Sequence, residues 1–195
     1  MSNGPGATGT LAATSLAELL IYALDKKLQG SLVFEETDGN KSALTLHDGV
    51  VVNSRLAIPK YRLGEVCVQL AMISEDDARA ALEKPGRRLT GDALLEAGLT
   101  QEELGRALCD QLLSHVQFIA ALPPDTVYGF YANKDFLQKW GGPHRVVDAL
   151  AVIWRAARSA HNPRTHRVVQ GLQKLEALKL HRHSRVGRFG FSSRE

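Results

Sequence analysis

Apolar and polar residues follow the 3.6-residue period of a helix near the start of the chain. Between residues 16 and 24, leucine and alanine recur every three or four positions, which predicts an amphipathic helix with one buried face. Ser15 precedes this segment and Glu18 follows three residues later, the arrangement of a capping box. Residues 1–10 are rich in Gly, Ser and Thr without such a period, and we expect them to be disordered.

The period then changes to that of β-strands. Leu32 and Phe34 alternate with their neighbours, and two further segments, 43–47 and 50–56, are short and rich in apolar residues. Asp48-Gly49 between these two segments is typical of a tight hairpin turn. Residues 11–60 are therefore predicted to form a small antiparallel β-meander covered by one helix, which places the protein in the α+β class.

A helical period returns in a part of the chain that repeats itself. Between residues 61 and 112 the pattern twice predicts two short helices joined by a tight turn, with Ser74 and Thr100 as N-caps. The apolar residues that we assign to buried faces include Leu82 in the first copy and Leu89 in the second. Neither copy buries much surface alone, so we expect a tandem helix-turn-helix unit packed on the β-meander.

The rest of the chain divides into an extended and a helical part. After a Pro-Pro break, residues 127–131 favour a returning strand, so residues 61–135 hold the helical unit together with this strand. Within residues 136–195, two stretches at 143–160 and 163–180 have the apolar stripe of amphipathic helices. We expect the chain to be the N-terminal part of a longer, multidomain protein.

Charge divides the chain in the same place. Residues 1–135 contain 12 Lys and Arg against 18 Asp and Glu, a net charge of −6, whereas residues 136–195 contain 12 against 3, a net charge of +9. An acidic body with a basic C-terminal part predicts docking within the chain, an acidic partner or a polyanion such as nucleic acid. The arginines expected to form a basic interaction surface are Arg145, Arg155, Arg158, Arg164 and Arg167.

The sequence offers no motif for catalysis. It lacks G-x-S-x-G, the P-loop, H-E-x-x-H and a G-x-G-x-x-G that follows a strand. Cys67 and Cys109 fall on predicted apolar helix faces, where a thiol behaves as a small hydrophobe. We therefore predict no catalytic residue, metal or cofactor. The chain also has neither a signal peptide nor a run of 18 apolar residues, so we expect a soluble cytoplasmic protein that does not insert into membranes.

The first 60 residues resemble a known family. The matching positions are the leucines of the first helix, then Gly30, Leu32 and Phe34, and then Asp48-Gly49-Val50-Val51. They are similar to the PATAN-type domain, a small α+β module at the front of bacterial response-regulator and motility-control proteins. Departures from its pattern are His47 and Ser54, the latter where a small alanine is usual. The resemblance implies a module that binds other proteins in bacterial signalling or surface motility, without catalysis.

The helical unit carries a second resemblance, through its two Arg-Leu-rich openings. These openings are similar to the tandem units in the N-terminal domain of type II secretion and type IV pilus assembly ATPases, some of which bind cyclic di-GMP. In the first copy Ala71 stands in place of the second glycine of the motif, and in the second copy Thr90 displaces the arginine. The residues that would bind the nucleotide are Arg62, Gly64, Arg88, Gly91 and Gln111.

Three hypotheses follow for the function. The first is a non-enzymatic protein–protein interaction module of a bacterial signalling or motility regulator, which would use a sheet edge and the groove between the helical units. The second is a cyclic di-GMP sensor that uses the Arg-Leu-Gly units. The third is nucleic-acid binding by the basic residues 136–195, which would weaken steeply as the salt concentration rises.

Overall fold

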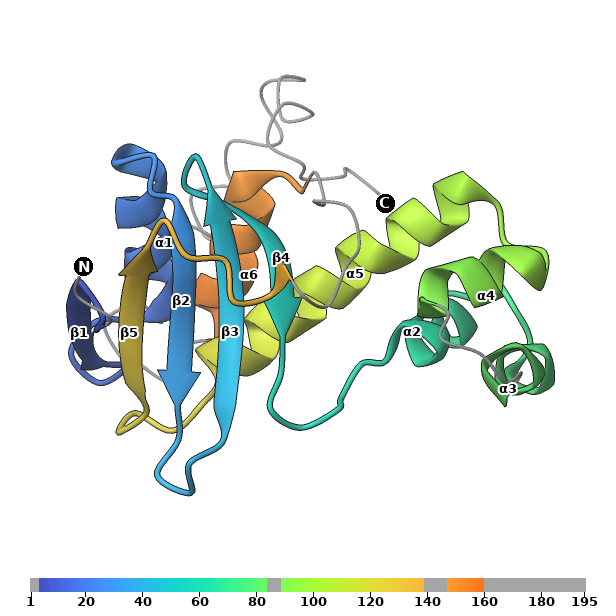
Figure 1. Cartoon of the computed structure of the whole chain (residues 1–195), viewed down its shortest axis with the longest axis horizontal. Helices are drawn as coiled ribbons and strands as arrows, with labels where there is room; N and C mark the ends of the chain where they lie inside the picture. The colour runs from blue at the N-terminus through green and yellow to red at the C-terminus, as the bar shows by residue number, and fades with distance from the viewer. Residues whose placement is uncertain (1–3, 84–88, 139–146, 160–195) are drawn as a thin grey trace, which may run out of the picture.

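The computed structural model describes residues 4–83, 89–138 and 147–159. Its centre is an antiparallel five-stranded sheet with the strand order β1-β5-β2-β3-β4 (Figure 1). Helices cover the sheet on one side and extend beyond it, so the predicted α+β class is confirmed. The strands are β1 (Ala7–Thr10), β2 (Gly30–Glu35), β3 (Lys41–His47), β4 (Val50–Arg55) and β5 (Val127–Ala132).

The strand register places alternate apolar side chains on one face of the sheet. Leu32 of β2 lies opposite Leu44 of β3, and Leu44 and Phe34 are completely buried. The turn between β3 and β4 is formed by Asp48 (φ 49°) and Gly49 (φ 80°), as the sequence predicts. Both residues have positive φ, which a two-residue type I′ hairpin requires. A Cβ at Gly49 would lie 2.3 Å from the carbonyl oxygen of Ala23, so only glycine fits there.

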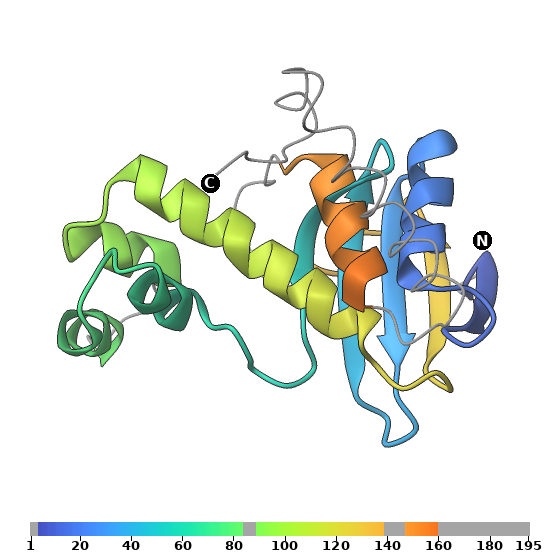
Figure 2. The same ribbon diagram turned by 180° about the vertical axis from the view of Figure 1, so that it is seen from behind.

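Three helices cover this apolar face. They are α1 (Leu16–Asp25), α5 (Gln101–Ala120) and α6 (Ala149–Ser159), and Figure 2 shows them in front of the sheet. The predicted capping box of α1 is confirmed, because the Ser15 N–H donates to Glu18 Oε2 at 2.8 Å. Side chains from the sheet and these helices form one large hydrophobic cluster, which we call the sheet core.

The chain crosses the opposite face of the sheet directly after β5. Figure 1 shows this segment passing in front of β2 and β3. The Ser31 hydroxyl donates to the carbonyl oxygen of Lys134 at 2.8 Å, and the Thr45 hydroxyl donates to Asp135 Oδ1 at 2.8 Å. These bonds satisfy the two hydroxyl groups, which are buried where the segment covers the sheet.

The remaining helices extend away from the sheet along the N-terminal half of α5. They are α2 (Leu63–Gln69), α3 (Glu75–Glu83) and α4 (Thr90–Glu96) (Figure 1). Of these, α2 and α4 form a second, smaller hydrophobic cluster with α5, which we call the helical-unit core. The 20 residues of α5 extend about 30 Å at 1.5 Å per residue, so this one helix belongs to both cores.

Three expectations from the sequence need correction or extension. The prediction that residues 1–10 are disordered is wrong for Ala7–Thr10, which pair with β5 as an edge strand. Glycine and threonine gave no apolar signal there, because the pairing uses backbone groups. The sheet has five strands, where a three-stranded meander and a returning strand were expected, and three helices cover it where one was expected. The predicted returning strand is β5, which pairs with β2 along its whole length.

Candidate interaction groove

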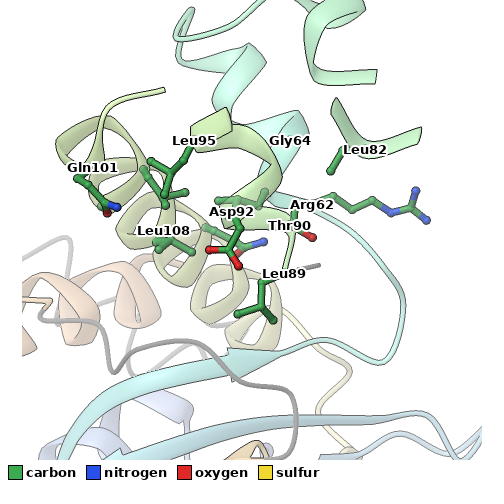
Figure 3. A pocket seen from close by; sticks show the side chains of 14 residues that line it. Arg62, Gly64, Leu82, Leu89, Thr90, Asp92, Leu95, Gln101 and Leu108 are labelled. Atoms are coloured by element: carbon green, nitrogen blue, oxygen red, sulfur yellow. The ribbon is translucent and has the colours of Figure 1, made fainter. Parts of the chain in front are cut away.

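A groove of about 660 Å³ lies between α2, α3, α4 and the N-terminal half of α5 (Figure 3). Six leucines line it and make its surface mainly apolar. Asp92, Thr90, Gln101 and Gln111 add a few polar groups. We call this site the leucine groove. Its leucines are Leu63, Leu82, Leu89, Leu95, Leu104 and Leu108.

Two of these leucines are strongly exposed. Leu82 has 46% and Leu89 has 50% of its surface accessible, although the sequence pattern assigned both to buried faces. In α3, the small side chains Ala78 and Ala81 are buried instead, and no residue of this helix belongs to the helical-unit core. The sequence period of apolar residues identifies the apolar face of a helix, but it does not show whether other residues of the same chain bury that face.

Two charged side chains are among the described residues that line the leucine groove: Asp92, in the first turn of α4, and Arg62, just before α2. The carboxylate of Asp92 lies among the leucines, with Thr90 beside it (Figure 3). The guanidinium group of Arg62 extends away from Asp92 and Leu108 in the same view. The groove therefore offers an acidic group beside its leucines, while the basic group of Arg62 is directed away from them.

The two predicted glycines of the nucleotide site make close helix contacts. A Cβ at Gly64 would lie 3.0 Å from Leu82 Cδ1, and a Cβ at Gly91 would lie 3.4 Å from Leu104 Cδ2. A side chain at Gly64 would press on Leu82, so this glycine lets α2 and α3 pack closely. Both positions also line the leucine groove.

The other predicted nucleotide ligands have structural partners or lie outside the described residues. The backbone N–H of Arg62 donates to Glu65 Oε2 at 3.0 Å at the start of α2, a bond that does not involve the guanidinium group. Gln111 Nε2 donates to the carbonyl oxygen of Tyr61 at 2.9 Å, which holds the linker from the sheet against α5. Arg88 lies outside the described residues. The structure thus brings Arg62, Gly64, Gly91 and Gln111 to one groove.

Two titratable groups of the helical unit have shifted pKa values. Burial raises the pKa of the Cys67 thiol, and the nearby charge of Glu103 raises it further. The backbone N–H of Thr100, and then its hydroxyl, lower the pKa of Glu103 by hydrogen bonding to the carboxylate. The raised pKa keeps Cys67 a neutral core residue. The lowered pKa reflects a stabilising contact, in which ionised Glu103 completes the capping box of α5.

The predicted basic surface is described only in part. Arg155 and Arg158 are exposed on α6, and Arg155 Nη1 donates to Gln117 Oε1 at 3.1 Å, which ties α6 to α5. Arg145, Arg164 and Arg167 lie outside the described residues. In the part of the chain that the structure describes, no three His, Cys, Asp or Glu side chains gather as a metal site would require. Across the same part, no helix combines the length and apolarity needed to cross a bilayer.

The fold and the groove define a class of protein: an α+β module whose sheet carries a helical extension with an open, leucine-lined groove. Comparison of the chain with protein-family models, with curated proteins and with solved structures finds no match.

Proposed function

We propose that the protein is a non-enzymatic protein–protein interaction module, and that the leucine groove is its binding surface. The observation that carries this proposal is the exposure of Leu82 and Leu89 on a concave, mainly apolar surface. Scattered exposed leucines are common, but several that line one groove are typical of a site for an apolar partner segment. Burial of these side chains would provide the binding free energy.

The two helix pairs support the interpretation of a tandem unit. After α2, the Met72 N–H donates to the carbonyl oxygen of Cys67 at 3.0 Å; after α4, the Leu99 N–H donates to that of Leu94 at 3.1 Å. Each of these hydrogen bonds joins residues five positions apart. Each closes a turn that contains a residue with positive φ, Ala71 in the first turn and Gly98 in the second. The repeated geometry favours two copies of one unit with the groove between them.

The similarity of the first 60 residues to the pattern of PATAN-type domains supports a role in bacterial signalling or motility. The partner would be a protein of a bacterial signalling or motility pathway in the cytoplasm, and the chain would form the front of a multidomain regulator. The leucine groove would then provide the specificity, because its exposed leucines line one concave surface.

Quantitative capture of partners by paired variants tests the proposal. Leu82→Asp/Leu89→Asp places two charges in the groove at exposed positions, so the fold should persist while groove-dependent partners are lost. The matched control is Ile21→Asp/Tyr22→Asp on α1, where the side chains are 54% and 58% exposed. Partners retained by the control and lost with the groove variant support the proposal. Identical partner sets for both variants would exclude the groove as the binding surface.

Cyclic di-GMP binding is the second candidate, since four of the five predicted nucleotide ligands line the groove. Asp92 counts against it, because a carboxylate repels the phosphates of a dinucleotide. Calorimetric titration of the intact protein with cyclic di-GMP decides the matter. Heat that is absent in Arg62→Ala but retained in Arg79→Ala, a change to another exposed arginine, would favour the nucleotide.

A further inference from the structure

The chemistry of the leucine groove specifies the kind of segment that fits it. Its leucines require an apolar face on the ligand, and Asp92 favours a basic group beside that face. The surroundings are also acidic: residues 61–111 contain 10 Asp and Glu against 6 Lys and Arg. A basic amphipathic segment therefore complements the groove in both polarity and charge.

The chain carries such a segment in residues 160–195, which lie outside the described part. These residues contain 8 Lys and Arg against 2 Asp and Glu. Within them, four apolar residues recur at helical spacing, at Val168, Leu172, Leu175 and Leu178, and we call these four the stripe.

The lengths of the groove and of this stripe agree. The groove follows α5 from Gln101 to Gln111, about 15 Å at 1.5 Å per residue. From Val168 to Leu178 is also ten residues, so the stripe extends about 15 Å as a helix.

The connection is long enough to reach the groove. Arg155 of α6 contacts Gln117, which lies six residues, or about 9 Å, beyond the groove along α5. Residues 160–167 join the end of α6 to the stripe, and eight extended residues span roughly 26 Å. α6 lies beside the half of α5 next to the sheet (Figure 2). The segment can therefore enter the groove of its own chain.

We propose that residues 164–180 bind in the leucine groove of the same chain and regulate its access. This inference rests on the proposed function, because a groove closed by its own chain regulates binding only if partners use it. A partner must then displace the segment. Tethering raises the effective concentration to the order of millimolar, so even a weak contact keeps the groove mainly occupied.

A cysteine reporter in the full chain tests this proposal. Thr90→Cys places a thiol in the groove without removing a leucine, and peptide mass spectrometry follows its alkylation separately from that of Cys67 and Cys109. In this background, Leu172→Asp/Leu175→Asp should raise the alkylation rate at position 90 by about tenfold or more, because it removes the tethered contact. The control, Gln170→Asp/Gln173→Asp, adds the same charge on the opposite face of the helical pattern and should leave the rate within about twofold.

Three results would overturn the proposal. The reporter could react equally fast with and without the leucine substitutions, which would mean that the groove is open. Protection that decreases on dilution would assign the contact to a second copy of the chain. A parallel increase in the alkylation of Cys67 would mean that the segment stabilises the helical unit without occupying the groove.

Partner capture separates this inference from the proposed function. If the segment occupies the groove, Leu172→Asp/Leu175→Asp should increase the capture of groove-dependent partners. An unprotected reporter together with partners lost in Leu82→Asp/Leu89→Asp would reject the inference and retain the proposed function. A protected reporter without any groove-dependent partner would retain the intramolecular contact and reject the proposed function.

Discussion

The sheet core and the helical-unit core differ greatly in size. Among the described residues, the sheet core contains 20 buried side chains from strands and helices that are distant in sequence, whereas the helical-unit core contains seven. Around the smaller core, Leu82 and Leu89 remain exposed. The difference in size predicts that the sheet part is the more stable scaffold and that the helical unit, which carries the proposed binding site, opens more easily.

The largest expected effect comes from the sheet core. Phe34 is completely buried, so Phe34→Ala removes a large side chain and leaves a cavity that neighbouring strands cannot close. We expect a loss of about 3–5 kcal/mol in the free energy of unfolding. Urea denaturation followed by circular dichroism measures it. A loss below about 1 kcal/mol would mean that this core is not the main source of stability.

A leucine truncation in the helical unit should act more locally. Leu94 is completely buried there, and Leu94→Ala should cost about 2–4 kcal/mol. Because Cys67 belongs to the same small core, its alkylation should accelerate while the amide protons of β2 and β3 stay protected. Leu44→Ala is the matched control, since Leu44 is equally buried in the sheet core. Equal loss of strand protection in both variants would show that the two cores unfold as one.

The same contrast explains how much of the fold could be predicted from the sequence. The helix after Ser15, the hairpin at Asp48-Gly49 and the caps at Ser74 and Thr100 depend on local patterns, and the structure confirms them. Strand β1 has no local signal, because its place at the sheet edge depends on β5, more than 100 residues away. Long-range pairing of this kind is beyond a local pattern.

The candidate site was predictable in its residues and less so in their roles. Arg62, Gly64, Gly91 and Gln111 do line one groove, as the repeated motif suggested. Yet Gly64 serves helix packing and Gln111 holds the linker at Tyr61. Asp92 was not among the predicted site residues, and the exposure of Leu89 was missed. Its position directly after the charged segment Arg87-Arg88 could have suggested an uncovered end of the helix.

The junction between the two regions depends on Gln111. The hydrogen bond from its side-chain amide to the carbonyl oxygen of Tyr61 is partly buried. Gln111→Ala should therefore lower the free energy of unfolding by about 1 kcal/mol. Hydrogen exchange should accelerate in α2 and α4 more than in the sheet. The control is Gln101→Ala, an exposed glutamine on the same helix. Equal effects of the two substitutions would remove the structural role assigned to Gln111.

Substitutions in the two turns of the helical unit should change its stability by smaller amounts and in opposite directions. Ala71 has φ 54° and Gly98 has φ 107°, so the first copy accepts strain that the second avoids. Ala71→Gly should stabilise the helical unit by up to about 1 kcal/mol, whereas Gly98→Ala should destabilise it by at least a similar amount. Cys67 alkylation rates report both changes. Shifts of the same sign would contradict the equivalence of the two turns.

The smallest expected effect is a dependence on pH that is confined to the helical unit. The pKa of Glu103 in the folded protein lies below its ordinary value of 4.5, because the N–H and hydroxyl of Thr100 bind the carboxylate. Its contribution to stability is therefore complete above pH 4.5 and is lost as the pH falls through the folded pKa.

Glu103→Gln should reduce this dependence, while Glu102→Gln, which removes the same charge next to the capping box, should retain it. Cys67 alkylation is too slow in acid to report the difference, since it needs the thiolate. Hydrogen exchange of the first turn of α5, compared between about pH 6 and about pH 3, is the appropriate measurement. If both variants lose protection with the wild-type pH profile, the capping box does not stabilise the start of α5 through the ionised carboxylate.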